Sequence, residues 1–233
     1  MDPCIAELPL ELVTKVLEAR ALYRFFHAGD EEVQALRGVN ITADRGEMVA
    51  LVGPSGSGKS TLLACIAGID EPDGGHVVIE GNRITRRSEV RKGRLRARSL
   101  GVVLQSNNLL EHLTVIQNVA LAQKLAAGQR TTDPLGILRV IGIANRANSY
   151  PSMLSGGEAV RASIAVAVAN DPPLVIADEP TGELDSANEE KVLELFAELC
   201  NQGAAFLIAT HSNKVAARAT RVVHLRDGVL VDG

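Results

Sequence analysis

The chain has 233 residues, 46% of them hydrophobic and 22% charged, an ordinary balance for a globular protein with a substantial core. Its formal net charge of −4 disfavours a nucleic-acid-binding protein with an overall basic surface. No apolar run approaches the roughly 20 residues that a spanning helix needs, so the chain by itself is not expected to cross a bilayer.

The cysteines and the N-terminus indicate a reducing compartment. Cys4, Cys65 and Cys200 lie far apart and show neither metal-ligand nor disulfide spacing. Residues 1–12 contain acidic residues but no Lys or Arg, so they do not resemble a signal peptide. A cytoplasmic protein is therefore expected.

Hydrophobic periodicity predicts strands that alternate with helices. A strand over 16–26 is followed by a turn-like Arg37-Gly38 and a second strand over 39–43. Further strands are predicted over 48–52, 76–80, 100–105, 174–177, 205–209, 222–225 and 229–231. Helices are predicted over 60–67, 115–125, 135–143, 158–169, 188–200 and 213–219. This alternation predicts an α/β fold with a mostly parallel sheet and a helical subdomain inserted at 109–170.

A glycine-rich loop follows the strand over 48–52 and fits the phosphate-binding pattern GxxxxGK[ST]. Its glycines allow successive backbone N–H groups to face an anion, and the next helix adds its positive dipole end. Lys59 would reach the β- and γ-phosphates, and the Ser60 hydroxyl would bind Mg²⁺. The predicted phosphate-binding residues are Gly53, Pro54, Ser55, Gly56, Ser57, Gly58, Lys59, Ser60 and Thr61.

Two carboxylates end the apolar strand over 174–177. Asp178 suits the magnesium shell opposite Ser60, and Glu179 would hold and polarise an attacking water as general base. Adjacent acids alone are weak signals, but together with a phosphate loop they point to nucleotide hydrolysis.

The sequence Leu154-Ser155-Gly156-Gly157-Glu158 resembles the signature motif of ATP-binding-cassette (ABC) ATPases. The other motifs of that family follow the same order along the chain. Gln105 resembles the Q-loop glutamine, Asp185 belongs to a D-loop-like Glu183-Leu184-Asp185, and His211 resembles the switch histidine. Phe26 stands where the family places the aromatic residue that stacks on adenine.

The resemblance implies an ATPase that binds ATP and Mg²⁺. Glu179, His211, Gln105 and Lys59 would be catalytic, and Ser60, Gln105 and Asp178 would bind the metal. Two copies, or this chain and a second cassette, would dimerise head to tail. Each ATP would then lie between the phosphate loop of one copy and residues 154–158 of the other.

The resemblance also implies the architecture and the partners. A P-loop NTPase core over 14–108 and 171–233 would include an antiparallel β portion near the N-terminus, within a single domain over 1–233. Residues 109–170 would form the helical signature subdomain and transmit motion through Gln105 to a membrane permease. The protein would sit on the cytoplasmic face of the membrane and bind no nucleic acid.

Three functions remain open on these grounds. Several segments resemble cassettes of the lipoprotein-releasing and macrolide-exporter type, which favours an exporter ATPase; they are residues 100–105, 108–110, 113–115, 177–182 and 184–185. A cell-division-type cassette that acts as an ATP-gated signal or scaffold is the alternative. A soluble cassette for ribosomes or nucleic acid is disfavoured by the acidic balance and the single cassette.

The chain departs from the family pattern after the signature. Ala159 and Val160 stand where polar or basic residues are common, and Val166 stands where an Arg is common. We therefore expect ATP turnover that is modest or dependent on a partner. Glu183 would either weaken dimer closure, pair with a basic partner or lie solvated in its loop.

Two further clusters stand out. Residues 83–98 hold eight basic residues and one acid; they form either a solvated helix face or a contact with anionic lipid or a partner protein. Three of the six aromatic residues lie within Tyr23 to Phe26. We expect Phe26 to face adenine and Tyr23 and Phe25 to pack within the strand, although the strand register leaves Phe25 as an alternative.

Overall fold

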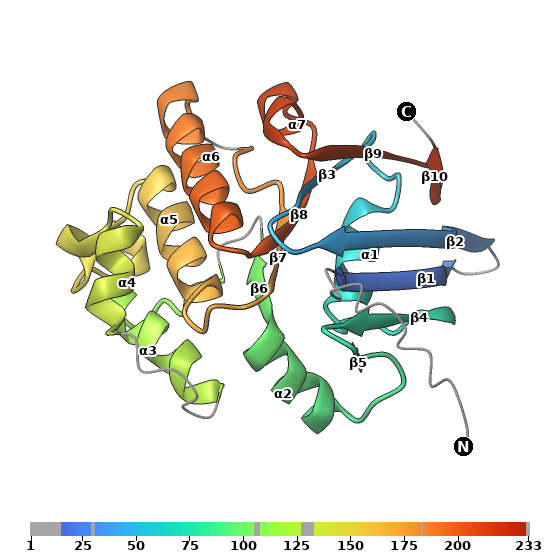
Figure 1. Ribbon diagram of the computed structural model, residues 1–233, viewed down its shortest axis with the longest axis horizontal. Coiled ribbons are helices and arrows are strands. Elements are labelled where there is room, and N and C mark those ends of the chain that lie inside the picture. The colour runs from blue at the N-terminus through green and yellow to red at the C-terminus, as the bar shows by residue number, and fades with distance from the viewer. Residues whose placement is uncertain (1–14, 29–30, 105–107, 127–132, 183, 232–233) are drawn as a thin grey trace, which may run out of the picture.

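The computed structural model describes residues 15–28, 31–104, 108–126, 133–182 and 184–231. Ten strands and seven α-helices occupy these ranges, together with two short 3-10 helices (Figure 1). Within these ranges, no helix combines the length and the apolar character needed to cross a membrane.

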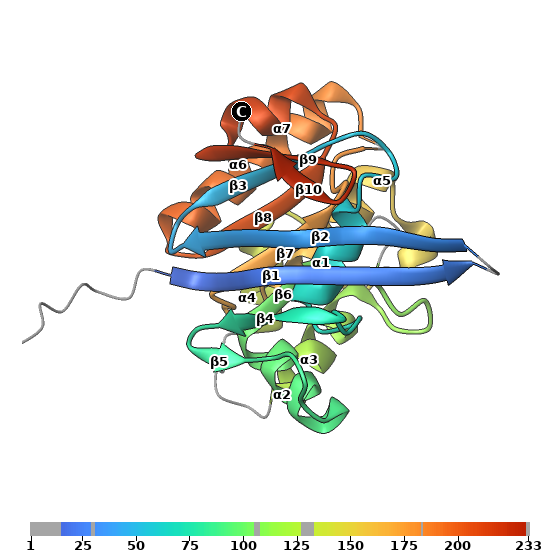
Figure 2. The same cartoon turned by 90° about the vertical axis from the view of Figure 1, so that its right-hand side faces the viewer.

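The strands form two sheets that lie side by side (Figure 2). The four-stranded sheet has the antiparallel order β2-β1-β4-β5, and the six-stranded sheet has the order β10-β9-β3-β8-β7-β6. In the larger sheet, β9, β3, β8, β7 and β6 are parallel, while β10 returns beside β9 as a hairpin. The strands are β1 (Lys15–Ala28), β2 (Glu31–Asp44), β3 (Met48–Val52), β4 (Gly74–Ile79), β5 (Asn82–Arg83), β6 (Leu100–Val103), β7 (Leu174–Asp178), β8 (Ala205–Thr210), β9 (Arg221–Arg226) and β10 (Val229–Val231).

The helices are divided between the core and a lateral group (Figure 1). Between β6 and β7 the chain forms α3, α4, η1, η2 and α5, which lie together on one side of the larger sheet. The helices are α1 (Lys59–Ile66), α2 (Glu89–Ser99), α3 (Val115–Leu125), α4 (Pro134–Val140), η1 (Ala144–Arg146), η2 (Pro151–Met153), α5 (Gly156–Ala167), α6 (Ser186–Asn201) and α7 (Asn213–Arg218).

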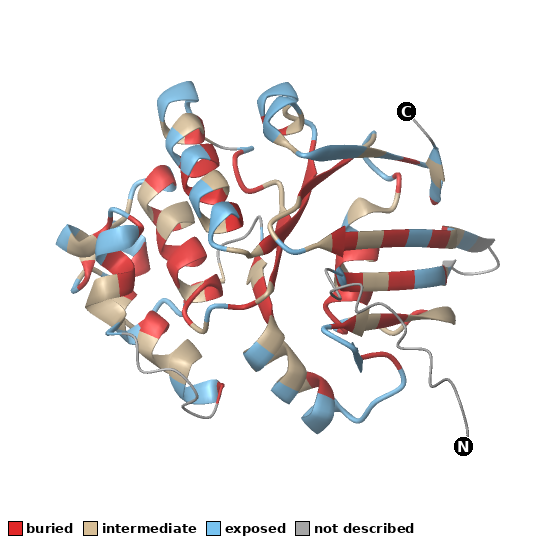
Figure 3. Ribbon diagram, viewed as in Figure 1, coloured by how far each residue is buried: buried red, intermediate tan, exposed pale blue. Residues whose placement is uncertain are grey.

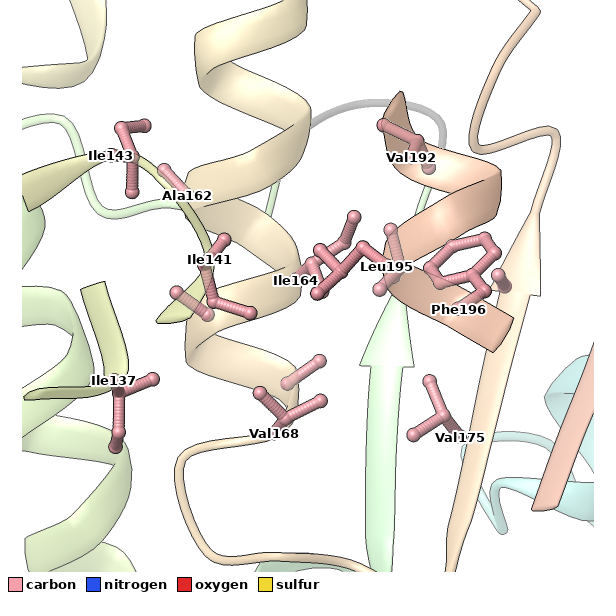
Figure 4. Close-up of a cluster of buried hydrophobic side chains, with 14 of the residues drawn as sticks. Ile137, Ile141, Ile143, Ala162, Ile164, Val168, Val175, Val192, Leu195 and Phe196 are labelled. Atoms are coloured by element: carbon pink, nitrogen blue, oxygen red, sulfur yellow. The ribbon is translucent and has the colours of Figure 1, made fainter. Parts of the chain in front are cut away.

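Two hydrophobic clusters hold these layers together (Figure 3). One joins the lateral helices and α6 to the sheet, and its side chains include Ile141, Ile164, Val175 and Phe196 (Figure 4). The other lies between the two sheets and encloses α1. Strands such as β7 and β8 are buried along their length, as strands covered on both faces should be.

The α/β fold class predicted from the alternation is confirmed, and several local predictions need correction. Arg37-Gly38 is not a turn but part of β2, where Arg37 pairs with Tyr23. Gly38 is an extra residue between two ladder pairs, with φ of 76°, and a Cβ there would lie 2.8 Å from the Tyr23 hydroxyl. A bulge therefore produced the turn-like signal.

The predicted ends of two elements also move. The strand predicted over 100–105 ends at Val103. The helix predicted from Glu158 begins at Gly156, because Ser155 caps it with a reciprocal hydrogen-bond pair to Glu158.

Candidate nucleotide site

A cleft of about 930 Å³ opens beside the loop between β3 and α1. Its walls come from β1, β2, the phosphate loop, the ends of β7 and β8, and the β9–β10 hairpin. The predicted site residues that line it are Phe26, Gly53, Pro54, Ser55, Gly56, Gly58, Lys59, Ser60, Thr61, Asp178, Glu179 and His211. The tertiary structure thus brings these twelve predicted site residues, which range from position 26 to position 211, together around a single cleft.

The loop from Gly53 to Gly58 has the backbone that an anion nest needs. Gly56 and Gly58 have φ of 79° and 103°, in the left-handed region that favours glycine. α1 begins directly afterwards at Lys59, so its N-terminus faces the loop. The Lys59 Nζ donates hydrogen bonds to the carbonyl oxygens of Gly53 and Pro54, at 2.8 and 3.1 Å. The lysine therefore lies across the loop.

Two distant segments support the phosphate loop from behind. The Gly228 N–H donates to the Ser57 carbonyl oxygen at 3.1 Å, and the Arg37 N–H donates to the Gly228 carbonyl oxygen at 2.8 Å. A Cβ on Gly58 would lie 2.5 Å from the Ala35 carbonyl oxygen. The loop conformation is therefore fixed by tertiary contacts with β2 and the β9–β10 hairpin.

Glu179 and His211 meet at the ends of adjacent strands. The Glu179 Oε1 lies 2.9 Å from the His211 Nδ1, and the His211 backbone N–H donates to Oε2 at 3.4 Å. Glu179 is a non-glycine residue with φ of 48°, and its backbone N–H still donates to the Ala209 carbonyl oxygen. A left-handed residue at a strand end is a local strain that functional sites often contain.

A buried carboxylate lies behind this pair. The Glu189 Oε1 accepts from the Ser212 hydroxyl at 2.7 Å and from the Thr181 hydroxyl at 3.4 Å. Its Oε2 lies 3.0 Å from the Lys214 Nζ. Burial alone would raise the pKa of Glu189, but the hydrogen bonds from Ser212 and Lys214 lower it overall. Glu189 therefore joins the loop after β7 to the loop after β8.

The hydroxyl and carboxylate chemistry expected for Mg²⁺ is present in the cleft. Ser60 and Asp178 both line it, and oxygen ligands of these types suit Mg²⁺, which usually keeps several waters and binds the phosphates of its nucleotide. Among the described residues no cluster of three or more His, Cys, Asp or Glu side chains forms a metal site of its own. The donor set therefore fits a metal that arrives with a nucleotide.

Phe26 lines the cleft and is 40% exposed. The Arg24 guanidinium lies 4.6 Å from the ring centroid and is held by Asp70 at 2.8 and 2.9 Å. This cation–π contact fixes the ring. Tyr23 instead packs against Gly38 and Gly74, as a strand-packing residue should.

The signature residues are not at this cleft. Ser155 is the N-cap of α5, its backbone N–H donates to Glu158 Oε2 at 2.9 Å, and Arg146 Nε lies 2.9 Å from Glu158 Oε1. The Ser155 and Arg146 hydrogen bonds lower the pKa of Glu158 to about 2. Asp185 caps α6, so the predicted signature and D-loop residues present two capped helix N-termini.

Some predictions fall outside these observations, and some cleft residues were missed. Gln105 and Glu183 lie outside the described residues. Sequence reasoning missed the cleft residues contributed by β2 and the final hairpin. They are Val33, Gln34, Ala35, Arg37, Asp227 and Gly228. The Asp227-Gly228 turn was predicted, but no sequence pattern indicated that it would meet the phosphate loop.

The fold and the cleft define a P-loop nucleotide hydrolase with a helical insertion. Residues 36–182 match the family described as ABC transporter. The chain belongs to this family and is an ABC-type ATPase, the ATP-binding subunit of a transporter.

Curated relatives are similar along almost the whole chain. An uncharacterized ABC transporter ATP-binding protein of Thermotoga maritima is 41% identical over 217 residues, covering 92% of this chain and 93% of the relative. The lipoprotein-releasing system ATP-binding protein LolD of Shewanella denitrificans is 41% identical, covering 93% and 95%. The macrolide export ATP-binding/permease protein MacB of Chlorobium phaeobacteroides is 39% identical, and this chain spans 33% of its length.

Solved structures agree with the fold. The ATP-binding cassette MJ0796, in a dimeric post-hydrolysis state bound to ADP and Pi, has a TM-score of 0.87 and 32% identity. That match covers 93% of this chain and 97% of MJ0796. The resemblance to ABC ATPases that the sequence motifs indicated is thereby confirmed.

Proposed function

We propose that this chain is the energy-coupling subunit of an exporter-type ABC transporter, a peripheral protein that dimerises head to tail around two ATP–Mg and drives a separate membrane permease. The observation that carries the catalytic part is the contact between Glu179 and His211 at the mouth of the phosphate-loop cleft. We expect this carboxylate and this imidazole to face the γ-phosphate end of a bound nucleotide.

Each side chain has a separate role in the proposal. Lys59 and the loop N–H groups hold the phosphates, Ser60 and Asp178 hold Mg²⁺, and Phe26 stacks on adenine. Mg²⁺ would supply charge neutralisation on the phosphate oxygens. Glu179 accepts the proton of the attacking water, and His211 orients that carboxylate through its Nδ1–H. Gln105 keeps its predicted roles as a catalytic residue, as a metal ligand and as the link that transmits motion from the nucleotide site to the permease.

Dimerisation completes the site in this proposal. Residues 154–158 form the N-terminal end of α5 and do not line the cleft of the same chain, so they would meet a nucleotide only on a second copy. The dimeric MJ0796 structures support such an arrangement for a similar chain. Ser155 and the N-terminus of α5 would then face the γ-phosphate from across the interface.

An apolar groove that borders the nucleotide cleft, and shares Ser60 and Asp178 with it, offers a place for the membrane partner. It has a volume of about 230 Å³, and Leu63, Ile69, Val102 and Leu104 are among its lining residues. Leu104 directly precedes Gln105, so a permease segment in this groove would contact the chain next to the predicted Q-loop. The LolD and MacB relatives, named for lipoprotein release and macrolide export, support an exporter-type partner.

The catalytic assignment is tested with two variants and one control. Glu179→Gln should bind ATP and accumulate as a dimer, but hydrolyse it at least about a hundredfold more slowly, because the water loses its base. Lys59→Ala should lose ATP affinity. The matched control is Glu194→Gln, which changes an exposed glutamate of α6 and should behave like the parent.

Phosphate release and equilibrium ATP binding are the two measurements. Hydrolysis by Glu179→Gln at the parent rate would remove Glu179 as base, and unchanged ATP affinity of Lys59→Ala would remove the phosphate-loop assignment. Purification from detergent-solubilised membranes tests the partner. A permease with a large extracytoplasmic domain supports the exporter, whereas cell-wall regulators alone favour the cell-division type.

A further inference from the structure

The segment 83–98 carries eight of the 24 lysine and arginine residues of the chain, and none of these eight lines the cleft. Its eight basic residues and one acid give a local charge of +7, so the remainder of the chain carries −11. It comprises the end of β5, a loop and α2, which lies at the margin of the molecule in both cartoon views (Figures 1 and 2).

Within the part of the chain that the structure describes, two of these cations attach α2 to the body of the protein. Lys92 is buried, and its Nζ lies 2.5 Å from Glu71 and 3.1 Å from Glu89. The Arg96 Nη1 donates to the Gly68 carbonyl oxygen at 3.0 Å. These contacts fix the helix and occupy the nearby acidic groups.

The remaining cations point outward. Arg91, Arg94 and Arg98 follow the i, i+3, i+7 spacing of one helix face, Arg87 precedes them, and all four are exposed. We call these four residues the arginine face. None of them has an ion-pair partner among the residues that the structure describes. Like charges at this spacing destabilise a helix, and an anionic surface would relieve that repulsion.

Two aliphatic side chains in and near α2 are also exposed. Val90 in α2 is 65% exposed. Ile69, next to the Gly68 that Arg96 contacts, is 60% exposed and lines the apolar groove. A permease segment in the groove would therefore lie beside α2. A mixed surface of arginines and isolated aliphatic side chains is typical of contact with lipid headgroups.

We propose that the arginine face of α2 binds the anionic phosphate headgroups of the membrane that holds the permease. This inference rests on the proposed function. The overall negative charge does not oppose it, because screening limits charge interactions to about 8 Å at physiological salt, so the local +7 governs. The binding orients the groove toward the permease.

Sedimentation with lipid vesicles tests the proposal with the full chain. Vesicles of phosphatidylcholine with about 30% phosphatidylglycerol should retain the protein, and vesicles of phosphatidylcholine alone should not. The triple variant R91Q/R94Q/R98Q should lose about tenfold or more in partitioning onto the anionic vesicles. The control K15Q/R139Q/K191Q removes the same charge from exposed positions elsewhere and should bind like the parent.

Both triple variants should keep the ATPase rate of the parent, which shows that they fold. Equal losses in the two variants, equal binding to neutral vesicles, or no binding by the parent would each overturn the proposal. Binding of the parent to an acidic peptide but not to anionic vesicles would also overturn it. Because vesicle binding needs no hydrolysis, a failed Glu179 assignment would leave this test intact.

A different observation carries a second inference, which also rests on the proposed function. Glu189 contacts the Thr181 and Ser212 hydroxyls, two residues after Glu179 and one after His211. We infer that Glu189 is a positioning residue that holds these two loops in register, so that His211 meets Glu179. It lies on α6, which Asp185 caps, so the same helix joins both loops to the predicted D-loop.

Steady-state kinetics separate this role from a structural one. Glu189→Ala should lower kcat about tenfold or more with KM for ATP nearly unchanged, because binding uses the phosphate loop and not this pair. Glu189→Gln should recover most of kcat, since it keeps the hydrogen bonds to both hydroxyls. The control Glu190→Ala removes the ion pair with Arg218 from the same helix and should keep the parent kcat.

The kinetics of these variants test the role of Glu189 independently of the role assigned to Glu179. A Glu189→Ala enzyme with parent kcat, or a fall in kcat matched by Glu190→Ala, would contradict it. If Glu179→Gln were itself fully active, the proposed function would fail first. Thermal unfolding of each variant confirms that the comparison is made between folded proteins.

Discussion

Gly58 shows how one residue type makes the nucleotide site possible. Its φ of 103° is strained for any residue with a Cβ, and a Cβ would also lie 2.5 Å from the Ala35 carbonyl oxygen. Gly142 has a comparable backbone, with φ of 74°, but a Cβ there would meet no atom within 4 Å. Comparing a substitution at Gly58 with one at Gly142 therefore distinguishes the cost of backbone strain from the cost of a steric collision with β2.

Alanine at these two glycines should have different effects. Gly142→Ala should lower the free energy of unfolding by about 1 kcal/mol through backbone strain alone. Gly58→Ala should lower it by about 3 kcal/mol or more and abolish ATP binding, since the β2 backbone cannot move freely. Urea denaturation and equilibrium ATP binding check this. Equal destabilisation of the two variants would show that the contact with Ala35 is easily relieved.

At the scale of elements, α5 combines a well-formed N-terminus with an unusual body. Ser155 and Glu158 form a capping box, and Arg146 pairs with Glu158 from η1. Ala159 is buried, and Val160 and Val166 pack against the lateral core. The positions where the family often has polar residues therefore face inward in this chain and contribute to packing. The expected modest turnover stays a prediction.

Glu158 should make stability depend on pH in acid. Its folded pKa of about 2 lies below the ordinary 4.5, so its contribution is present above pH 4.5 and is lost as the pH falls toward 2. Glu158→Gln should unfold at a lower temperature than the parent at neutral pH, and the two should converge near pH 2. Thermal unfolding as a function of pH measures this.

The control for Glu158 is again Glu194→Gln, which should match the parent at each pH. A difference between Glu158→Gln and the parent that stays constant down to pH 2 would show that the carboxylate charge is not its source.

For the whole molecule, the separation of the signature from the cleft is the central feature. α5 begins at Gly156 in the lateral helical group (Figure 1), and none of residues 154–158 is among those that line the cleft. A single chain therefore carries the phosphate loop of one nucleotide site and the signature residues of another. In a head-to-tail dimer, each half would find its complement on the partner.

Mixing defective chains tests this arrangement. Lys59→Ala damages the phosphate loop and Ser155→Arg damages the signature, so each variant alone should hydrolyse little ATP. Co-expressed together, they should recover up to about a quarter of the parent activity. Half of the dimers are then mixed, and each mixed dimer has one undamaged site. A mixture as inactive as its components would contradict a site shared between chains.

Local sequence patterns predicted much of the fold and most of the residues that line the cleft. The helix over 115–125 and the hairpin around Asp227-Gly228 match α3 and the β9–β10 pair. The phosphate loop and the Asp178-Glu179 pair were readable because each is a short run with a fixed relation to a strand end. The β2 strand was too short in the prediction, because the bulge at Gly38 interrupts its alternation.

Most element types, the phosphate loop and the order of the motifs could be read from the amino-acid sequence, since they depend on periodicity and on chemistry within a few residues. Tertiary structure alone decided which distant segments meet. It placed β2 and Gly228 behind the phosphate loop and Glu189 behind Glu179 and His211, and it attached α2 through Arg96 to Gly68, next to the apolar groove. These contacts join residues far apart in the chain, and their geometry depends on how the two sheets and the helices pack.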